Sequence, residues 1–203
     1  MVGQPLSVRA ARVNPAVPAA GVPAAAKPTR TMQVLNFVLF QAAWFAGVLG
    51  AAHGAPLLGT AIVTLVIVWH VTVSARPAVE ARLVGCALLI GAAFETFCVQ
   101  LDQVAYASGQ PIPQLAPYWM VAMWGLLAIA LNVTMRWLKR RWLLAAVLGA
   151  VAGPMSYAGG VRLGAASFLH ATAAIVTLAI SWALLMPLMM WLSDRFDGVA
   201  TRG

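Results

Sequence analysis

The fold class of this 203-residue chain is decided by residues 115–142, "LAPYWMVAMWGLLAIALNVTMRWLKRRW". The first part is an apolar run of the kind that crosses a bilayer as a helix, which takes roughly 20 residues. The run ends among tryptophan and basic side chains, which gather where a membrane helix meets the cytoplasmic interface. The stretch therefore predicts a membrane helix followed by a short cytoplasmic loop.

Similar apolar runs recur along the whole chain. Its residues are 62% hydrophobic and 9% charged, and the mean hydropathy of +0.87 lies well outside the range of soluble domains. The runs lack the period-two alternation of a transmembrane barrel. The sequence predicts an all-α, polytopic membrane protein, a bundle of six transmembrane helices at about 33–52, 55–74, 83–106, 117–135, 142–160 and 166–192.

The segments that flank this bundle are more polar. Residues 1–31 are rich in proline and alanine and contain no continuous apolar run, which is typical of a disordered cytoplasmic tail. Residues 32–193 form the predicted transmembrane domain, and 194–203 a second, short cytoplasmic tail. No cofactor motif occurs, so we expect no cofactor.

The basic residues follow the predicted membrane topology. With both termini in the cytoplasm, all 13 basic residues except Arg162 fall on the cytoplasmic side. This is the asymmetry of the positive-inside rule, so the helix assignment and the orientation support each other. A basic cytoplasmic face also suits anionic lipid. We therefore expect membrane lipid rather than nucleic acid as a partner, and a protein partner or a homo-oligomer stays open.

Two acids interrupt the oily stretch "AAFETFCVQLDQ", residues 92–103. Glu95 and Asp102 are seven residues apart, which places them on one face of a continuous helix about 10 Å apart along its axis. An acid at the membrane centre costs about 3 kcal/mol, so both should face the bundle interior or water. By contrast, Arg76 and Glu80 have the i, i+4 spacing of a solvated ion pair.

Arg162 is the natural partner for these acids because it lies on the side that the charge rule leaves free of basic residues. A candidate polar site in the outer half therefore comprises Glu95, Asp102, Arg162, His170 and His53. Arg162 closes an internal salt bridge with one of the acids, belongs to a proton site or a site that binds an anionic ligand in bidentate fashion, or is simply exposed. His53, His70 and His170 lack the spacing of metal ligands, so no metal site is predicted.

Small and polar residues form stripes on several predicted helices. Gly149, Gly153, Ser156 and Gly160 fall within roughly 40° of one another, and such a stripe lets helices approach closely in lipid. Asn36 and Asn132 end comparable stripes on helices 33–52 and 117–135. These asparagines either form interhelical hydrogen bonds or belong to a functional polar pocket.

Three stretches resemble a bacterial family labelled domain of unknown function 2878. They are "NFVLFQAAWFAGVLGAA" (36–52), "LAPYWMVAMWGLLAIALNVTMRWL" (115–138) and "RWLLAAVLGAVAGPMSYAGGVRLGA" (141–165). The resemblance implies a multi-pass protein of the bacterial inner membrane without an assigned reaction. It also implies an acid near Glu95, whereas the "LDQ" around Asp102 departs from the family pattern.

Three classes of function fit these observations. The first is binding or transport of an anionic lipid or small solute through an outward-facing polar site. The second is a membrane-embedded lipid-modifying enzyme, in which Glu95 or His170 acts as general base beside Ser156, Tyr157 or Ser167. The third is a structural or assembly partner of other membrane proteins, with the polar groups used only for packing.

Overall fold

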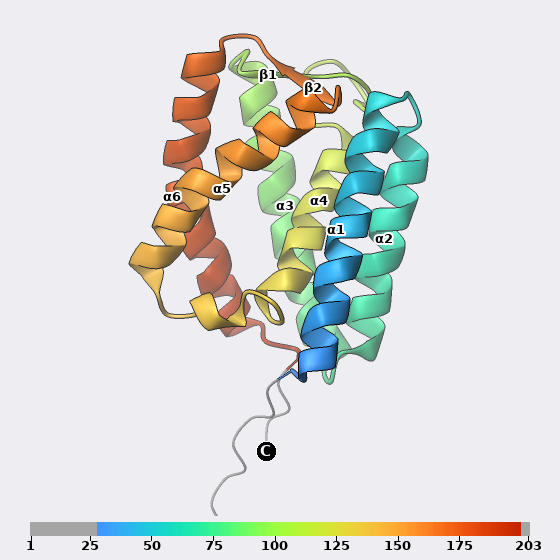
Figure 1. The fold of residues 1–203 in the computed structure, drawn as a ribbon, viewed down its shortest axis with the longest axis vertical. Coiled ribbons are helices and arrows are strands. Elements are labelled where there is room, and N and C mark those ends of the chain that lie inside the picture. Colours follow the sequence, from blue (N-terminus) through green and yellow to red (C-terminus); the bar gives the residue numbers. More distant parts are fainter. Residues whose placement is uncertain (1–27, 200–203) are drawn as a thin grey trace, which may run out of the picture.

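The computed structural model describes residues 28–199, and in this part of the chain it confirms the predicted all-α fold class. The helices run through the sequence in the order shown in Figure 1. They are α1 (Arg30–Ala52), α2 (Pro56–Val73), α3 (Pro77–Gln100), α4 (Tyr118–Leu131), α5 (Trp142–Arg162) and α6 (Ala171–Arg195), with the short 3-10 helix η1 (Arg136–Leu138) between α4 and α5.

Five of these helices are long and apolar enough to cross a membrane, and the exception is α4 with its 14 residues. Most of α4 is buried by the surrounding helices. The turn that follows it, from Asn132, is largely buried as well. Non-helical backbone is tolerated at membrane depth where protein rather than lipid surrounds it. The chain is therefore a multi-pass membrane protein in which α4 is an enclosed, shorter helix.

The helices pack as two groups. In the first, α4 contacts α1, α2 and α3, while α1 also packs along α2. In the second, α5 and α6 pack mainly on each other, and α5 crosses the molecule obliquely in Figure 1. Glycine permits the close approach of α5 to α6, because a Cβ atom on Gly149 would lie 2.2 Å from the backbone oxygen of Trp182. The space between the two groups contains the site described below.

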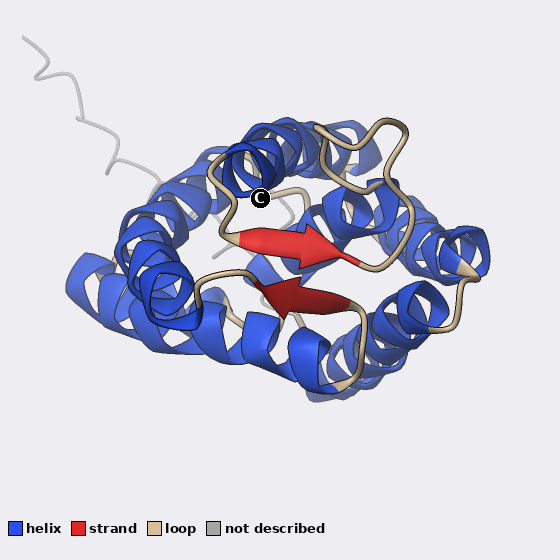
Figure 2. Cartoon of the chain, turned by 90° about the horizontal axis from the view of Figure 1, so that it is seen from above, coloured by secondary structure: helices blue, strands red, loops and turns tan. Residues whose placement is uncertain are grey.

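Two short strands close one end of the bundle, here called the sheet end. β1 (Val104–Tyr106) and β2 (Ala166–Phe168) are antiparallel, with Val104 opposite Phe168 and Tyr106 opposite Ala166. Seen from above, they lie across the ring of helices (Figure 2). The sequence instead predicts helix over both strands.

The chain leaves α3 earlier than predicted because Asp102 adopts a left-handed backbone with φ 52°. That conformation ends a helix.

The opposite end, here called the terminal end, contains Arg30 and residues 196–199. Helix α1 begins at Arg30, capped by the Thr29 hydroxyl, which accepts a hydrogen bond from the amide of Met32. The predicted tail 1–31 lies mostly outside the described residues, as do 200–203. Asp194 and Arg195 belong to α6, and the segment after it packs on the bundle, where Gly198 accepts a hydrogen bond from the Arg76 amide at 2.8 Å.

Candidate functional site

Glu95 is the centre of a buried cluster that joins three other elements to α3. Its side chain is fully buried, and its carboxylate accepts three hydrogen bonds. The indole nitrogen of Trp124 in α4 donates to Oε1 at 2.7 Å, and the Tyr157 hydroxyl in α5 donates to the same oxygen. The Tyr106 hydroxyl in β1 donates to Oε2. The acid therefore ties α4, α5 and the small sheet to α3.

Local sequence explains how these side chains reach the acid. Gly91 lies one turn before Glu95, and a Cβ atom there would lie 2.3 Å from Cγ of Trp124. The glycine thus lets the indole lie against α3. The turn at Asp102 directs the chain back as β1, which places Tyr106 over the bundle interior. Burial, followed by the nearby Glu95 charge, raises the pKa of Tyr106 well above its ordinary value, so this phenol stays a proton donor.

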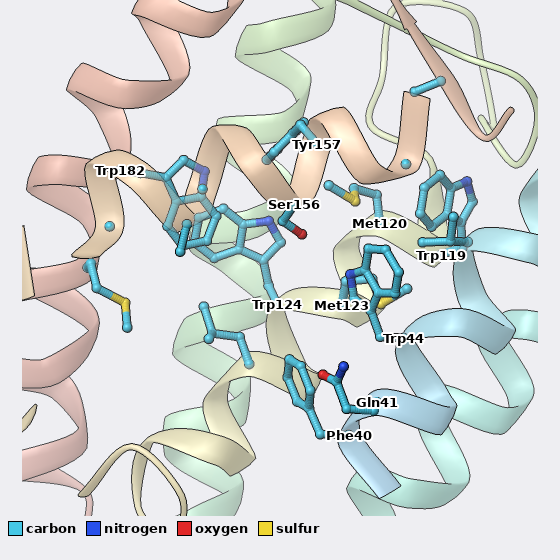
Figure 3. A pocket seen from close by; sticks show the side chains of 18 of the residues that line it. Phe40, Gln41, Trp44, Trp119, Met120, Met123, Trp124, Ser156, Tyr157 and Trp182 are labelled. Carbon is cyan, nitrogen blue, oxygen red and sulfur yellow. The ribbon is translucent and has the colours of Figure 1, made fainter. Parts of the chain in front are cut away.

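The three donors of this cluster also line a cavity of about 410 Å³ between the two helix groups. Its other walls come from α1, α4 and α6, and Figure 3 shows the labelled side chains gathered around a common space. The lining is predominantly aromatic and methionine-rich. Its aromatic members are Phe40, Trp44, Tyr106, Trp119, Trp124, Tyr157 and Trp182.

The cavity opens between α1 and α5. Tyr106, Trp119, Trp124 and Tyr157 are buried on its floor, whereas Gln41 of α1 and Ala152 and Ser156 of α5 are exposed at its rim. The outward residues around this rim are apolar: Phe45 of α1 is 46% exposed and Met155 of α5 is 67% exposed. The opening therefore lies between two helices that are long and apolar enough to cross a membrane.

The other members of the predicted polar site lie away from Glu95. Arg162 is exposed in the last turn of α5 and takes part in no ion pair with the described residues. Asp102 is exposed in the turn after α3, so the expected shared helix face is interrupted.

The two outer histidines are exposed at the sheet end. His53 Nδ1 is bound to the Leu49 carbonyl, and His170 immediately precedes α6. Of the five residues of the predicted polar site, only Glu95 is hydrogen-bonded to side chains that line the cavity.

All four residues of the predicted small-residue stripe line the cavity. Gly149 and Gly153 also pack closely on α6, where added Cβ atoms would lie 2.2 Å and 2.3 Å from atoms of Trp182. At Gly160 an added Cβ atom would have no neighbour within 4 Å.

Asn36 forms interhelical hydrogen bonds. Its Nδ2 donates to the Ile129 carbonyl at 3.2 Å, and its Oδ1 accepts from Thr134.

A second buried acid, Glu80, lies near the terminal end. His70 Nε2 lies 3.0 Å from Oε1, and Oε2 accepts from Asn132 Nδ2 at 3.0 Å and from the Gly198 amide at 2.9 Å. His70, Glu80 and Asn132 are fully buried. The expectation of a solvated Arg76–Glu80 pair is therefore wrong, because the i, i+4 rule considers one helix surface and not the segments that cover it.

Ion pairs fix the C-terminal segment beside this second cluster. An Asp197 carboxylate oxygen lies 2.7 Å from the Arg136 guanidinium and 2.9 Å from the Lys139 ammonium. Burial lowers the pKa of Lys139, while its hydrogen bond to Asp197 opposes that shift. Within residues 28–199, no three His, Cys, Asp or Glu side chains gather as a metal site would require.

Comparison with known proteins gives a family and no individual relative. No curated protein and no solved structure matches the chain. The sequence profile of the family described as a protein of unknown function (DUF2878) matches residues 33–188. That range runs from α1 into α6 and contains Glu95 and all three of its hydrogen-bond donors. The chain belongs to the DUF2878 family, as the resemblance of its helices implies.

Proposed function

We propose that this protein binds a membrane lipid by taking the lipid's apolar chain into the cavity between α1, α4 and the α5–α6 pair. The observation that carries the proposal is the aromatic and methionine-rich cavity of about 410 Å³. Ligand sites are typically concave, mostly apolar and about 300–1,000 Å³ in volume. The cavity opens through the exposed rim of Gln41 and Ser156 toward the hydrocarbon region, where lipid chains are the abundant occupants.

The chemistry of the lining favours a flexible chain over a polar solute. Met120, Met123 and Met186 line the cavity together with the aromatic rings. Methionine is unbranched and polarizable, so it adapts to chains of different shape. A small polar solute would have to leave water for walls that offer it few hydrogen-bonding groups. A lipid chain has no such penalty.

The alternatives from sequence have less support in the site. The anionic ligand depended on Arg162, which is exposed and away from Glu95. The enzyme depended on a general base beside a nucleophile. Tyr157 is near Glu95, but both carboxylate oxygens already accept hydrogen bonds, and Ser156 lies exposed at the rim. Binding of a lipid chain therefore explains the cavity without a basic residue or a catalytic pair.

We also propose that the protein lies in the bacterial inner membrane with its terminal end in the cytoplasm. The support is the position of the basic residues: Arg76, Arg136 and Lys139 gather around the C-terminal segment. Positive charge is enriched on the cytoplasmic side of membrane proteins. A C-terminal fusion to green fluorescent protein should fluoresce in bacteria, and one to alkaline phosphatase should be inactive. The reverse pattern would contradict the orientation.

The lipid proposal is tested by filling the cavity without disturbing the helices. Gly160→Leu directs a side chain into open cavity space, because no atom lies within 4 Å of its added Cβ. Gly85→Leu is the matched control, since Gly85 also has no neighbour within 4 Å but does not line the cavity.

The readout is native mass spectrometry of both variants and the wild-type protein, each purified from membranes. We expect one retained lipid on the wild-type protein and on Gly85→Leu, and its loss from Gly160→Leu. Equal lipid retention by all three proteins would refute the assignment of the cavity.

A further inference from the structure

The carboxyl group of Glu95 is buried and has no positive partner among residues 28–199. Its hydrogen bonds come from two phenols and one indole, all neutral groups. None of the ion pairs among the described residues includes it. The described residues that line the adjacent cavity carry no Lys, Arg or His either. Hydrogen bonds from neutral donors offset only part of the free energy that a carboxylate loses on leaving water.

The same carboxylate changes the electronic character of the cavity floor. Tyr106, Tyr157 and Trp124 each donate their one polar hydrogen to Glu95, and all three residues line the cavity. Donation to an anion polarises the donor, so electron density shifts toward the aromatic ring. A cation is attracted to the negative face of an aromatic ring within about 6 Å of its centre. In its ionised form, Glu95 thus makes these three rings more attractive to positive charge.

Two further tryptophans pack on the rings of this aromatic floor. The ring of Trp119 meets that of Tyr106 edge to face, with centroids 5.7 Å apart and an interplanar angle of 86°. Trp182 stacks on Trp124 with centroids 5.0 Å apart and an angle of 21°. Aromatic side chains recognise quaternary ammonium groups, and among them tryptophan has the strongest cation-binding ring face.

We propose that the ligand of this cavity is an amphiphile with a positively charged ammonium or quaternary ammonium head group, held against the rings of Trp124, Tyr106 and Tyr157. This inference rests on the proposed function, since the apolar chain of the same ligand occupies the rest of the cavity. The rings that donate to Glu95 attract a positive head group and would repel an anionic one. The carboxylate acts through the rings that it holds and does not itself line the cavity.

The test compares head groups on one alkyl chain. The probes are dodecyltrimethylammonium, dodecanol and dodecyl sulfate, titrated into the full-length protein in lipid nanodiscs. Tryptophan fluorescence reports binding because Trp44, Trp119, Trp124 and Trp182 line the cavity, and empty nanodiscs correct for partition into lipid. The wild-type protein should bind the ammonium probe about tenfold or more tightly than dodecanol, and dodecyl sulfate most weakly.

Two variants locate the source of this preference. Glu95→Gln keeps the shape of the side chain and a carbonyl acceptor for Trp124 and Tyr157, and it should reduce the ammonium preference to within about twofold of dodecanol. Asp102→Asn removes the same charge from the exposed turn after α3 and should leave the preference intact.

An absence of ammonium preference in the wild-type protein would overturn the inference whether or not Glu95→Gln folds. A preference that survives Glu95→Gln would overturn it as well.

Gly160→Leu separates this failure from failure of the lipid proposal. If all three probes bind the wild-type protein equally and Gly160→Leu abolishes their binding, the cavity takes alkyl chains and only the head-group inference falls. If Gly160→Leu leaves the binding of every probe unchanged, the probes bind elsewhere and both proposals fall.

Discussion

The substitution Gly149→Ala should move α5 away from α6, whereas Gly160→Ala in the same helix should not. The added Cβ at Gly149 would lie 2.2 Å from the Trp182 carbonyl oxygen and 2.6 Å from Cβ of Met186. Neither atom belongs to the flexible end of a side chain, so the helices must move apart. Overpacking of this kind costs about 1–3 kcal/mol, and the higher helix propensity of alanine returns about 1 kcal/mol.

The expected net change for Gly149→Ala is therefore a loss of about 0–2 kcal/mol in the free energy of unfolding. At Gly160 no atom lies within 4 Å of the added Cβ, so only the propensity gain of about 0.5–1 kcal/mol remains. Reversible unfolding in mixed micelles with increasing sodium dodecyl sulfate measures both variants against the wild-type protein. Equal stability of the two variants would refute the close packing of α5 on Trp182.

The other predictions concern single contacts. Tyr157→Phe removes one hydrogen bond to the buried Glu95 carboxylate and should lower the free energy of unfolding by about 1–3 kcal/mol in the same micelle titration, and an unchanged midpoint would count against the cluster. Asp102→Gly should stabilise the protein by about 0.5–1 kcal/mol because the backbone there has φ 52°, whereas Asp102→Val should destabilise it; the opposite order of melting temperatures would show that the side chain matters more than the backbone. Gly198→Ala should detach the C-terminal segment, because its Cβ would lie 2.7 Å from the Arg76 carbonyl oxygen, and faster hydrogen exchange at residues 196–199 would report the detachment. Wild-type exchange rates in that variant would mean that the segment tolerates the methyl group.

The membrane architecture could be predicted from sequence because it depends on properties that each segment carries by itself. Apolar length and the basic residues around Lys139 predict the helices without any knowledge of their neighbours. The predicted helices differ from the observed ones mainly in where they end. Asp102 looked like a continuation of α3 because the heptad spacing from Glu95 assumes an unbroken helix, whereas the left-handed residue ends it. Strands of three residues such as β1 are too short to show a period of two.

The candidate site was only partly predictable because its contacts join distant elements. An acid in an oily run has to find donors, so the burial of Glu95 followed from its position. The identity of the donors depends on the rotation of α4 and α5 and on the course of β1, which place Trp124, Tyr157 and Tyr106 at one point. Arg162 was the expected partner by charge alone, yet its place on the last turn of α5 directs it outward.

Glu80 shows the same limit at the terminal end of the molecule. Its neighbours in sequence suggested a surface pair with Arg76. The structure buries the acid beneath His70 of α2 and the backbone of Gly198, which lies 118 residues further along the chain. The i, i+4 spacing describes one helix only, so it could not predict that the C-terminal segment folds back onto α3.

Photocrosslinking tests most directly whether a lipid chain occupies the cavity between α1, α4 and α5. A phospholipid with a diazirine in its acyl chain is incorporated into nanodiscs with the protein, illuminated, and its adducts are mapped by peptide mass spectrometry. We expect adducts on Met120 and Met123 of the cavity in the wild-type protein and their loss in Gly160→Leu. Adducts spread over outward-facing residues such as Leu57 and Leu65, with none in the cavity, would contradict the central claim.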